Sequence, residues 1–290
     1  MKRTFDIITD SGCDMPQSFF KEHGVVCVKL GFTMNNVHYE GESGENIDER
    51  EFYQKLRAGA MPTTYQVTGE TAKLYIEKSL KKGKDVLVIA FSSALSGTAS
   101  SFIVAARDLA KKYPERTIRV VDSLCASMGQ GLLLCYVVQK AETGASIKET
   151  TAFAESIKGK ILHHFTVDNL FHLKRGGRVS SATALMGSIL KIKPVLHVDE
   201  NGKLVSIGKT MGRKKALNAL VERFFKYRDT AEMQVFISHG DCLGDAEYVR
   251  DMLLQRAPEL HVTIGYIGAV IGSHAGAGTV ALFHKGKKRE

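Results

Sequence analysis

One stretch of the sequence decides the fold: residues 85–98 read DVLVIAFSSALSGT. Its first part, Asp85–Phe91, is apolar on both alternating faces, a pattern that indicates a strand in a sheet covered by helices on both sides. Its second part, Ser92–Thr98, is a loop of small and hydroxyl residues that leads into a helix expected to continue from Ser101 to Lys112. The first N–H groups of a helix have no partner within it and lie at the positive end of its dipole. The loop is therefore suited to holding an anion.

Around this stretch, the first half of the chain alternates short apolar strands with amphipathic helices. Strands are expected at Phe5–Thr9, Val25–Phe32, Asp85–Phe91 and Ile118–Val121, and helices at Met15–His23, Asp48–Leu56, Gly69–Lys82, Ser101–Lys112 and Ala126–Glu142. This alternation is typical of α/β folds, in which ligands bind beyond the carboxyl ends of parallel strands. Because the loop Ser92–Thr98 follows a strand, it lies at such an end.

From about residue 146 the pattern changes and predicts a mixed α+β arrangement. Helices are expected at Ser146–Ile157, Ser181–Leu190, Gly244–Arg256 and from Arg213 onward, strands at Ile161–Val167, Met233–Ser238 and His261–Val270, a basic loop at Arg175–Arg178, and a hairpin at Val195–Val198 and Leu204–Ile207. The hairpin is indicated by Asn201 and Gly202, which favour the positive φ of a tight turn. The sequence therefore predicts two domains: an N-terminal α/β domain with a parallel sheet, residues 1–159, and a C-terminal mixed α+β domain, residues 160–290.

The composition is that of an ordinary protein with a substantial core. Hydrophobic residues make up 44% and charged residues 24% of the 290 positions. The formal net charge is +9, which is compatible with binding to nucleic acid. The basic residues lie in short clusters, such as Lys111-Lys112 and Arg213-Lys214-Lys215, without interleaved aromatic residues or a DNA-reading motif. A solvated basic surface explains these clusters better, and no nucleic-acid partner is predicted.

Cysteine usage and hydropathy indicate a cytoplasmic protein. The five cysteines are odd in number and contain no CxxC pair, so neither a disulfide framework nor a zinc knuckle is predicted. The longest apolar stretches fall short of the ~20 residues of a membrane span, so no integral membrane segment is expected. Asp6 and Asp10 interrupt the N-terminus before the apolar core of a signal peptide forms. The predicted location is therefore the cytoplasm.

Three segments between the expected elements offer hydroxyls, an imidazole or glycine-exposed N–H groups. They are residues 62–68 (PTTYQVT), 92–98 (SSALSGT) and 272–279 (GSHAGAGT). Together they suit a carboxylate, which accepts several hydrogen bonds at once. Taken singly, Thr68, Ser92 and Ser96 are better explained as caps of the helices that follow them. Only the conjunction of the three segments favours a carboxylate site.

These segments belong to a series of motifs by which the chain resembles the DegV family of bacterial fatty-acid-binding proteins. The series consists of Ile7–Ser11 with Asp14, Thr63–Thr68, Leu95–Thr98, Val121–Ser123, His172–Ser180, Lys191–Pro194 and Ile271–His274 followed by Gly276 and Gly278. The motifs occur in the order of the family and cover nearly the whole length. The family includes the acyl-binding subunit of fatty acid kinase. The resemblance implies a two-domain fold with a ligand tunnel between the domains.

The resemblance implies that the ligand is a long-chain fatty acid, such as palmitate. Its carboxylate would be held by Thr64 and Ser96, with His274 close to the same head group. A long acyl chain buries many methylene groups at about 0.8 kcal/mol each, so an apolar tunnel supplies the affinity while the hydroxyls fix the orientation. The supporting residues in neighbouring positions are Gly97, Thr98 and Ser273.

The resemblance also implies a protein partner. The bound acid would be presented to an ATP-dependent fatty acid kinase, which converts the carboxylate to an acyl phosphate. Arg175 and Arg213 match basic positions that serve in docking that kinase, and the loop Arg175–Arg178 is either part of this docking patch or a solvated turn. The chain itself would then be a lipid-binding protein rather than an enzyme, with no catalytic residue and no cofactor besides the bound fatty acid.

An acyl hydrolase is the alternative function. In it Ser96 would be the nucleophile, His274 the base, and Asp10 or Asp122 the orienting carboxylate. The residues around Ser96 lack the Gly-x-Ser-x-Gly pattern that exposes the serine of α/β-hydrolases, and a free acid offers no bond to hydrolyse. Binding is therefore favoured over hydrolysis.

Nucleotide and metal sites are weaker alternatives. Gly276 and Gly278 hint at a phosphate loop, but the chain has neither the Gly-x-Gly-x-x-Gly nor the Walker pattern. The histidines are scattered without a zinc-binding spacing. Asp10 and Asp14 are better explained by capping of the helix that follows, so no metal is predicted.

Overall fold

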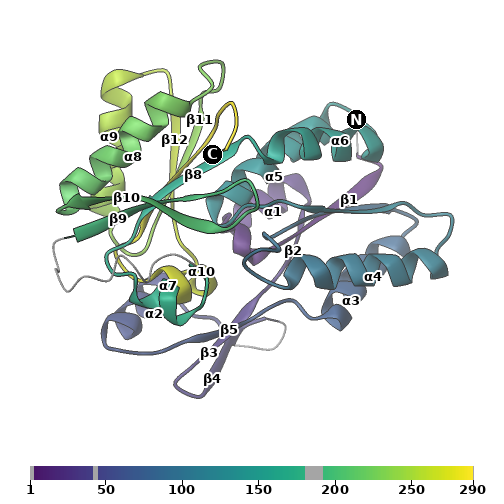
Figure 1. Ribbon diagram of the computed structural model, residues 1–290. Helices are drawn as coiled ribbons and strands as arrows, with labels where there is room; N and C mark the ends of the chain where they lie inside the picture. Colours follow the sequence, from purple (N-terminus) through teal and green to yellow (C-terminus); the bar gives the residue numbers. More distant parts are fainter. Residues whose placement is uncertain (1–2, 42–44, 180–191, 290) are drawn as a thin grey trace.

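The computed structural model describes residues 3–41, 45–179 and 192–289 of the chain (Figure 1). These residues form an α/β fold with a parallel sheet in the first half and a mixed sheet in the second, which confirms the predicted fold class. The two large sheets lie in separate lobes, and short helices and a small third sheet fill the region between and below them in Figure 1.

The first sheet has four parallel strands in the order β2-β1-β6-β7. The strands and helices of this half are β1 (Phe5–Asp10), α1 (Gln17–His23), β2 (Val26–Val28), α2 (Glu49–Arg57), α3 (Gly69–Leu80), β6 (Asp85–Ala90), α4 (Thr98–Lys112), β7 (Ile118–Asp122), α5 (Met128–Glu142) and α6 (Ile147–Lys158). Leu87 and Ile89 pack in one apolar cluster with residues of α5, and Val86 and Val88 pack in a second with residues of α3 and α4. Helices on both faces explain why β6 is apolar throughout.

The expected strand Val25–Phe32 is wrong as a single element, because its second part belongs to another sheet. That small antiparallel sheet consists of β4 (Val37–Glu40), β3 (Gly31–Met34) and β5 (Thr63–Tyr65), in this order. The chain leaves the first sheet at Leu30, whose N–H donates to the Ser11 hydroxyl at 2.9 Å. Val28, Leu30 and Phe32 are buried and Lys29 is exposed, so the alternation of a strand continues across the break and does not reveal it. The small sheet matters for the site because β5 carries Thr64.

The second half contains a six-stranded sheet in the order β10-β9-β8-β13-β11-β12. β11 and β12 pair in parallel, and the other neighbouring strands pair antiparallel. The elements are β8 (Ile161–Thr166), α7 (Phe171–Arg175), β9 (Ile192–Val198), β10 (Leu204–Met211), α8 (Arg213–Tyr227), β11 (Gln234–His239), α9 (Leu243–Arg256), β12 (His261–Tyr266), α10 (Ala269–Ala275) and β13 (Val280–Lys285). The predicted hairpin is confirmed as β9 and β10, and Gly202 in its turn has a φ of +79°.

Several boundaries in the second half differ from the expected ones, and two of these differences change the type of element. The expected strand His261–Val270 ends at Tyr266, and the rest of its apolar run begins α10. A short apolar run is compatible with a buried helix as well as with a strand, so periodicity does not separate the two. Arg175, expected in a loop, is the last residue of α7. The expected helix Ser181–Leu190 lies outside the described residues.

The two halves share a core. One apolar cluster includes Ile7 and Leu132 from the first half together with Phe165 and Phe283 from the second. α5 packs against β6 of the first sheet and also against β8, β11 and β13 of the second. The predicted division at residues 159/160 separates the two large sheets along the chain, and as a domain boundary it stays a prediction.

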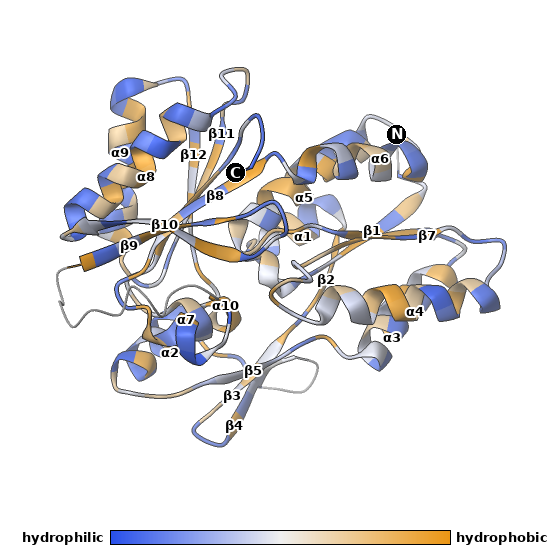
Figure 2. Ribbon diagram, in the orientation of Figure 1, coloured by the Kyte–Doolittle hydropathy of each residue, from blue (hydrophilic) through white to orange (hydrophobic). Residues whose placement is uncertain are grey.

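Hydropathy follows this arrangement. Figure 2 shows hydrophobic residues along α5 and the strands, and hydrophilic residues alternating with hydrophobic ones on α8 and α9. Among the helices of the described residues, none is long and apolar enough to cross a membrane.

Candidate functional site

A cavity of about 320 Å³ lies between the two halves. Its wall is mostly apolar, with Phe91 and Leu95 from the first half and Phe165, Ile271 and Phe283 from the second. The polar residues of the wall include Thr64, Ser96, Arg178 and His274. A cavity of this size and lining is typical of sites for small apolar ligands that carry a polar group.

Three residues predicted from the sequence meet at this cavity. Thr64 lies on β5, Ser96 lies on the loop between β6 and α4, and His274 lies in the last turn of α10. A hydrogen bond of 2.8 Å joins Thr64 Oγ1 to His274 Nε2, across 210 positions of the chain. The structure thus brings the three residues to one place, while their role in holding a ligand stays a prediction.

The loop that carries Ser96 is tied to the segment that follows β5. Ser96 Oγ lies 3.0 Å from Thr98 Oγ1 and accepts the N–H of Thr98 at 3.3 Å. Thr98 Oγ1 in turn accepts the N–H of Val67 at 3.3 Å. A Cβ atom on Gly97 would stand less than 3.0 Å from the side chain of Gln66, so this close approach requires glycine. Gly97 and Thr98 therefore hold the two segments together, and neither is among the residues that line the cavity.

Ser273, expected in a supporting loop, lies within α10. Its hydroxyl donates to Ala269 O at 2.7 Å, and the side chain is buried. This contact stabilises the helix that carries His274. If Ser273 supports the candidate site, it does so by stabilising the backbone of α10. This supporting role stays a prediction.

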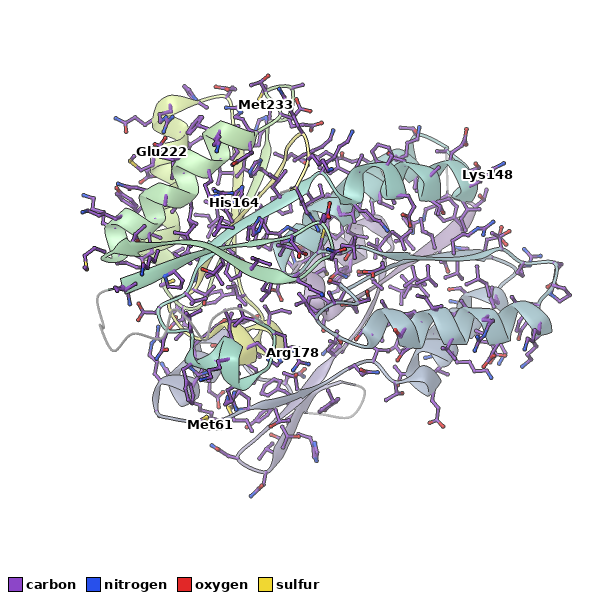
Figure 3. The ribbon with its side chains drawn as sticks, viewed as in Figure 1. Met61, Lys148, His164, Arg178, Glu222 and Met233 are labelled. Carbon is purple, nitrogen blue, oxygen red and sulfur yellow. The ribbon has the colours of Figure 1, made fainter. Side chains whose placement is uncertain are left out.

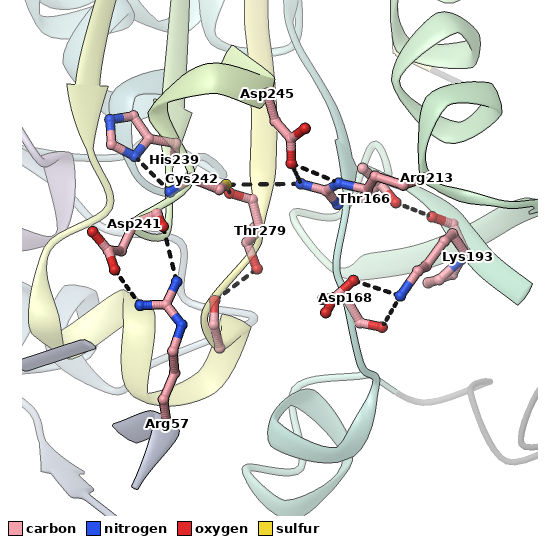
Figure 4. A network of polar contacts seen from close by, with 12 residues as sticks. Arg57, Thr166, Asp168, Lys193, Arg213, His239, Asp241, Cys242, Asp245 and Thr279 are labelled. Carbon is pink, nitrogen blue, oxygen red and sulfur yellow. Dashed lines mark hydrogen bonds and ion pairs between the residues drawn. The ribbon is translucent and has the colours of Figure 1, made fainter. Parts of the chain in front are cut away.

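The two predicted docking residues have partners inside the protein. Arg175 Nη2 donates to Pro62 O at 3.1 Å and to Ser273 O at 3.2 Å. Arg213 forms an ion pair with Asp245 at 2.8 Å, which connects the first turns of α8 and α9 (Figure 4). These contacts position neighbouring segments of the chain, and docking of a partner by either arginine stays a prediction.

Burial keeps the His274 imidazole neutral. Loss of hydration lowers the pKa of His274 to about 4, and the guanidinium groups of Arg178 and Arg175 act in the same direction. His274 Nδ1 has no hydrogen-bond partner in the described structure, and a Cβ atom on Gly176 would stand less than 3.0 Å from it. A neutral imidazole donates one hydrogen bond and accepts one, so His274 orients the Thr64 hydroxyl without supplying a charge.

A buried carboxyl group supports the start of the hydroxyl loop. Asp10 accepts the N–H of Gly12 at 3.0 Å and the N–H of Phe91 at 2.8 Å. Burial raises the pKa of Asp10 to about 6, although these two N–H groups and the Gln130 side chain act in the opposite direction. Because Phe91 follows β6 directly, Asp10 fixes the path by which the chain enters the loop.

The contacts do not favour the hydrolase alternative. Ser96 and His274 each bond to a different threonine rather than to one another. Asp10 and Asp122 accept backbone N–H groups, and His274 Nδ1 lacks the carboxylate that orients the base of a serine hydrolase. Among the residues that the structure describes, these side chains therefore do not form the hydrogen-bonded serine–histidine–aspartate triad of a hydrolase.

The nucleotide-site and metal-site alternatives also lack the necessary geometry. The N–H of Gly276 donates to Gly272 O at 2.8 Å and the N–H of Gly278 donates to Gly240 O at 2.7 Å, so neither is available to a phosphate. Within the described ranges, no group of three or more His, Cys, Asp or Glu residues is placed to hold a metal ion.

Arg178 is a cavity residue that the sequence does not single out. It belongs to the basic loop expected to dock a partner or to be a solvated turn, but its side chain lines the cavity. Its Nε donates to Leu95 O at 3.2 Å, next to Ser96. Because this contact spans 83 positions, no local spacing signals it.

Sequence comparison identifies the family. A family model described as an uncharacterised protein of the DegV family matches residues 4–286, and the chain therefore belongs to the DegV family. A DegV domain-containing protein of Clostridium perfringens is 42% identical over 289 residues, which cover 99% of each chain. Another from Streptococcus pyogenes serotype M1 is 37% identical over 282 residues, which cover 97% of each chain. The predicted family is thus confirmed.

Solved structures of the family share the fold. A DegV family protein from Thermus thermophilus, described as binding fatty acid, matches with a TM-score of 0.88 and 29% identity, covering 99% of this chain and 100% of that one. The Bacillus subtilis DegV protein, described as a fatty acid binding protein, matches with a TM-score of 0.83 and 29% identity over the same shares. The described two-sheet arrangement is therefore the DegV fold.

Proposed function

We propose that the protein binds a long-chain fatty acid, such as palmitate, in the cavity between its halves. The observation that carries this proposal is that Thr64, Ser96 and His274, from three distant segments, line one cavity whose wall is otherwise largely apolar. The two hydroxyls would hold the carboxylate, His274 would orient Thr64, and the apolar wall would take the acyl chain. The fatty acid binding described for the Thermus thermophilus and Bacillus subtilis proteins supports this assignment.

Energetics favour a long chain over a short one. Each methylene group removed from water contributes about 0.8 kcal/mol, so an acid of about 16 carbons gains on the order of 11 kcal/mol. Association costs about 4–15 kcal/mol in lost freedom of motion. A short acid gains too little to offset this cost, whereas a long one leaves a surplus to which the polar contacts add.

We also propose that the bound acid is presented to a fatty acid kinase. In that reaction a carboxylate oxygen forms a bond to the γ-phosphorus of ATP, the bond to the leaving ADP breaks, and an acyl phosphate results. This chain would hold and orient the carboxylate and would contribute no catalytic group. Because the partner uses ATP, the proposed location is the cytoplasm.

Native mass spectrometry of protein purified from cells tests the binding proposal. We expect a copurifying acid of about 16–18 carbons, identified after organic extraction, because a chain of this length gains enough from burial. Protein that carries no lipid and takes up none from palmitate-loaded albumin would contradict the proposal.

Single substitutions test the head-group residues. Thr64→Ala or Ser96→Ala removes a hydrogen bond to a charged acceptor, which is expected to weaken palmitate binding by roughly 10- to 100-fold in a displacement titration. Thr63→Ala and Ser100→Ala are the matched controls, because both side chains are exposed and lie outside the cavity wall. Equal affinities of the test and control variants for palmitate would show that the two hydroxyls do not bind the head group.

A further inference from the structure

Asp10, the last residue of β1, holds the start of the loop of residues 92–98, which we call the hydroxyl loop. Asp10 Oδ2 accepts the N–H of Phe91 at 2.8 Å, and Oδ1 accepts the N–H of Gly12 at 3.0 Å. The side chain is fully buried. The carboxylate therefore ties the end of β6 to the turn that follows β1, and each of its oxygens serves a different backbone segment.

The path from Phe91 to Ser96 is short and hydrogen-bonded. The N–H of Ser92 donates to Cys125 O at 3.0 Å, and the N–H of Ser96 donates back to Ser92 O at 3.1 Å. Phe91 lines the cavity, as Ser96 does. A shift of Phe91 would therefore change both the apolar wall and the position of the Ser96 hydroxyl.

The far end of the hydroxyl loop is held by the second half of the chain. Arg178, labelled beside α7 in Figure 3, donates from Nε to Leu95 O at 3.2 Å. A guanidinium group keeps its charge at every ordinary pH, so this contact does not respond to a proton. The contact of Asp10 at the start of the loop differs in this respect.

A second carboxylate, Asp122 at the end of β7, also contacts the hydroxyl loop, but it uses one oxygen. Its Oδ1 accepts the N–H groups of Ser93 and Leu124, both at 3.1 Å. The side chain is half-buried. An amide in place of Asp122 would keep the oxygen that is used, whereas an amide in place of Asp10 would leave one acceptor for two N–H groups. The two carboxylates therefore form a matched pair for substitution.

Burial makes the charge of Asp10 sensitive to pH near neutrality. It raises the pKa of Asp10 to about 6, although the bonds from the two N–H groups act in the opposite direction. The neighbours of Asp10 on the elements around it are Phe91 after β6, Val28 of β2, Gln130 of α5 and Cys13 of the 3₁₀ turn η1 (Ser11–Cys13). Cys13 is the titratable one of these neighbours, and burial raises the pKa of its thiol well above the ordinary value, so the thiol stays neutral.

We propose that Asp10 is a positioning residue for Ser96, and that binding of the fatty acid and uptake of a proton by Asp10 oppose each other. This inference rests on the proposed binding of the carboxylate by Ser96. A proton turns one oxygen of Asp10 into a hydroxyl, which is a donor facing an N–H group. The bond to Phe91 or to Gly12 then weakens, and the hydroxyl loop is less firmly held at its start. Because linkage is reciprocal, the bound acid makes Asp10 harder to protonate.

Asparagine substitutions at the two carboxylates test the positioning role in displacement titrations of the full-length chain with palmitate. Asp10→Asn leaves an N–H group without an acceptor, so we expect roughly 10-fold weaker binding. Asp122→Asn keeps the oxygen that is used and should bind palmitate as the wild type does. Equal affinities of the two variants would overturn the inference.

A double-mutant cycle separates positioning from a general loss of structure. If Asp10 acts through Ser96, Asp10→Asn should weaken palmitate binding much less in the Ser96→Ala background than in the wild type, because the hydroxyl that it positions is absent. The same loss in both backgrounds would show that Asp10 does not act through Ser96.

The wild type gives a further test that does not depend on the folding of a variant. The pKa of Asp10, followed by NMR of its carboxyl carbon, should be lower with palmitate bound than without it. An Asp10 pKa that palmitate leaves unchanged would overturn the inference while leaving fatty acid binding intact. Failure of the wild type to bind palmitate would overturn the proposed function and this inference together.

The pH profile of palmitate affinity should agree with the NMR result. Between about pH 7.5 and about pH 5.5, the affinity of the wild type should fall by roughly 3- to 10-fold more than that of Asp10→Asn. The titration of the fatty acid itself is common to both proteins, so the difference isolates Asp10. Parallel profiles would contradict the proposed linkage.

Discussion

The two walls of the cavity differ in the chemistry that they bring to the head group. The wall from the first half contributes the hydroxyls of Thr64 and Ser96, which are neutral and bond to a threonine or a histidine nearby. The wall from the second half contributes the His274 imidazole and the Arg178 guanidinium group. We call them the hydroxyl wall and the charged wall.

This difference separates orientation from selection. Hydroxyls bond many kinds of head group, so in the proposed function the hydroxyl wall would set where the polar end of the lipid lies. A guanidinium group pairs strongly with an anion, so in the proposed function the charged wall would favour a lipid that ends in an anion. Since the walls come from different halves of the chain, the site is complete only when the halves are packed together.

The largest effect on lipid affinity is expected when both hydroxyls of the hydroxyl wall are removed. The double variant Thr64→Ala/Ser96→Ala should weaken palmitate binding by roughly 100-fold or more, because two hydrogen bonds are lost. It should also weaken hexadecanol binding, since the hydroxyls serve any head group. Displacement titrations with both lipids measure this, and Thr63→Ala/Ser100→Ala is the control. Unchanged hexadecanol affinity would show that the hydroxyl wall, too, reads charge.

A smaller effect is expected from crowding the charged wall. Gly176→Ala places a Cβ atom less than 3.0 Å from His274 Nδ1, so the imidazole must move from Thr64. Overpacking of this kind is expected to lower the free energy of unfolding by about 1–3 kcal/mol in urea titrations. Gly159→Ala is the control, because nothing lies within 4 Å of its added Cβ atom. Equal stability of the two variants would mean that His274 is free to shift.

The charged wall should also respond to pH. The pKa of His274 is lowered to about 4 in the folded protein, whereas its ordinary value is 6.5. The stability contributed by the neutral imidazole is therefore fully present above pH 6.5 and is lost as the pH falls toward 4. Urea titrations between about pH 7.5 and about pH 4.5, which cover most of the interval between the ordinary and the lowered pKa of His274, should show the wild type losing stability relative to His274→Gln. Parallel profiles would contradict the lowered pKa.

The smallest effect on stability is expected at Arg213, outside both walls. Arg213→Ala removes a partly exposed ion pair with Asp245 and should change the free energy of unfolding by less than about 1 kcal/mol. The preference for palmitate should not change, whereas acyl phosphate formation with ATP and the kinase, trapped by hydroxylamine, should fall. Arg256→Ala, which removes an exposed pair with Glu222, is the control. If Arg213→Ala formed as much acyl phosphate as the wild type, the docking role of Arg213 would be contradicted, whereas the proposed lipid binding would not.

Arg175 is a poor choice for the same docking test. Its guanidinium group holds the carbonyls of Pro62 and Ser273, which lie close in sequence to Thr64 and His274. A loss of acyl phosphate formation in Arg175→Ala would therefore report a disturbed head-group site as well as a lost docking contact.

Most of the fold follows from local patterns. The apolar run of β6 indicates a strand buried on both faces, and the structure packs α3 and α4 on one face and α5 on the other. The pattern fails where one element follows another and the apolar residues continue across the junction. Residues 25–32 pass from one sheet to another at Leu30, and the apolar residues after Tyr266 begin α10 instead of extending β12.

The residues of the candidate site also differ in how well the sequence predicts them. Thr64, Ser96 and His274 stand out in the sequence because of their residue types, their segments and the resemblance to the DegV family. Arg178 does not stand out from Arg175, because both lie in one basic loop. Only packing shows that Arg175 holds backbone carbonyls while Arg178 lines the cavity.

The order of residue types was enough to establish an α/β chain of the DegV family with three candidate head-group residues, because periodicity and motifs are local properties of a sequence. The tertiary structure decided that these residues meet, that Ser273 serves α10, and that a guanidinium group joins the cavity wall. Such contacts join positions as far as 210 residues apart. They depend on how the two sheets pack around a shared core, which no local pattern records.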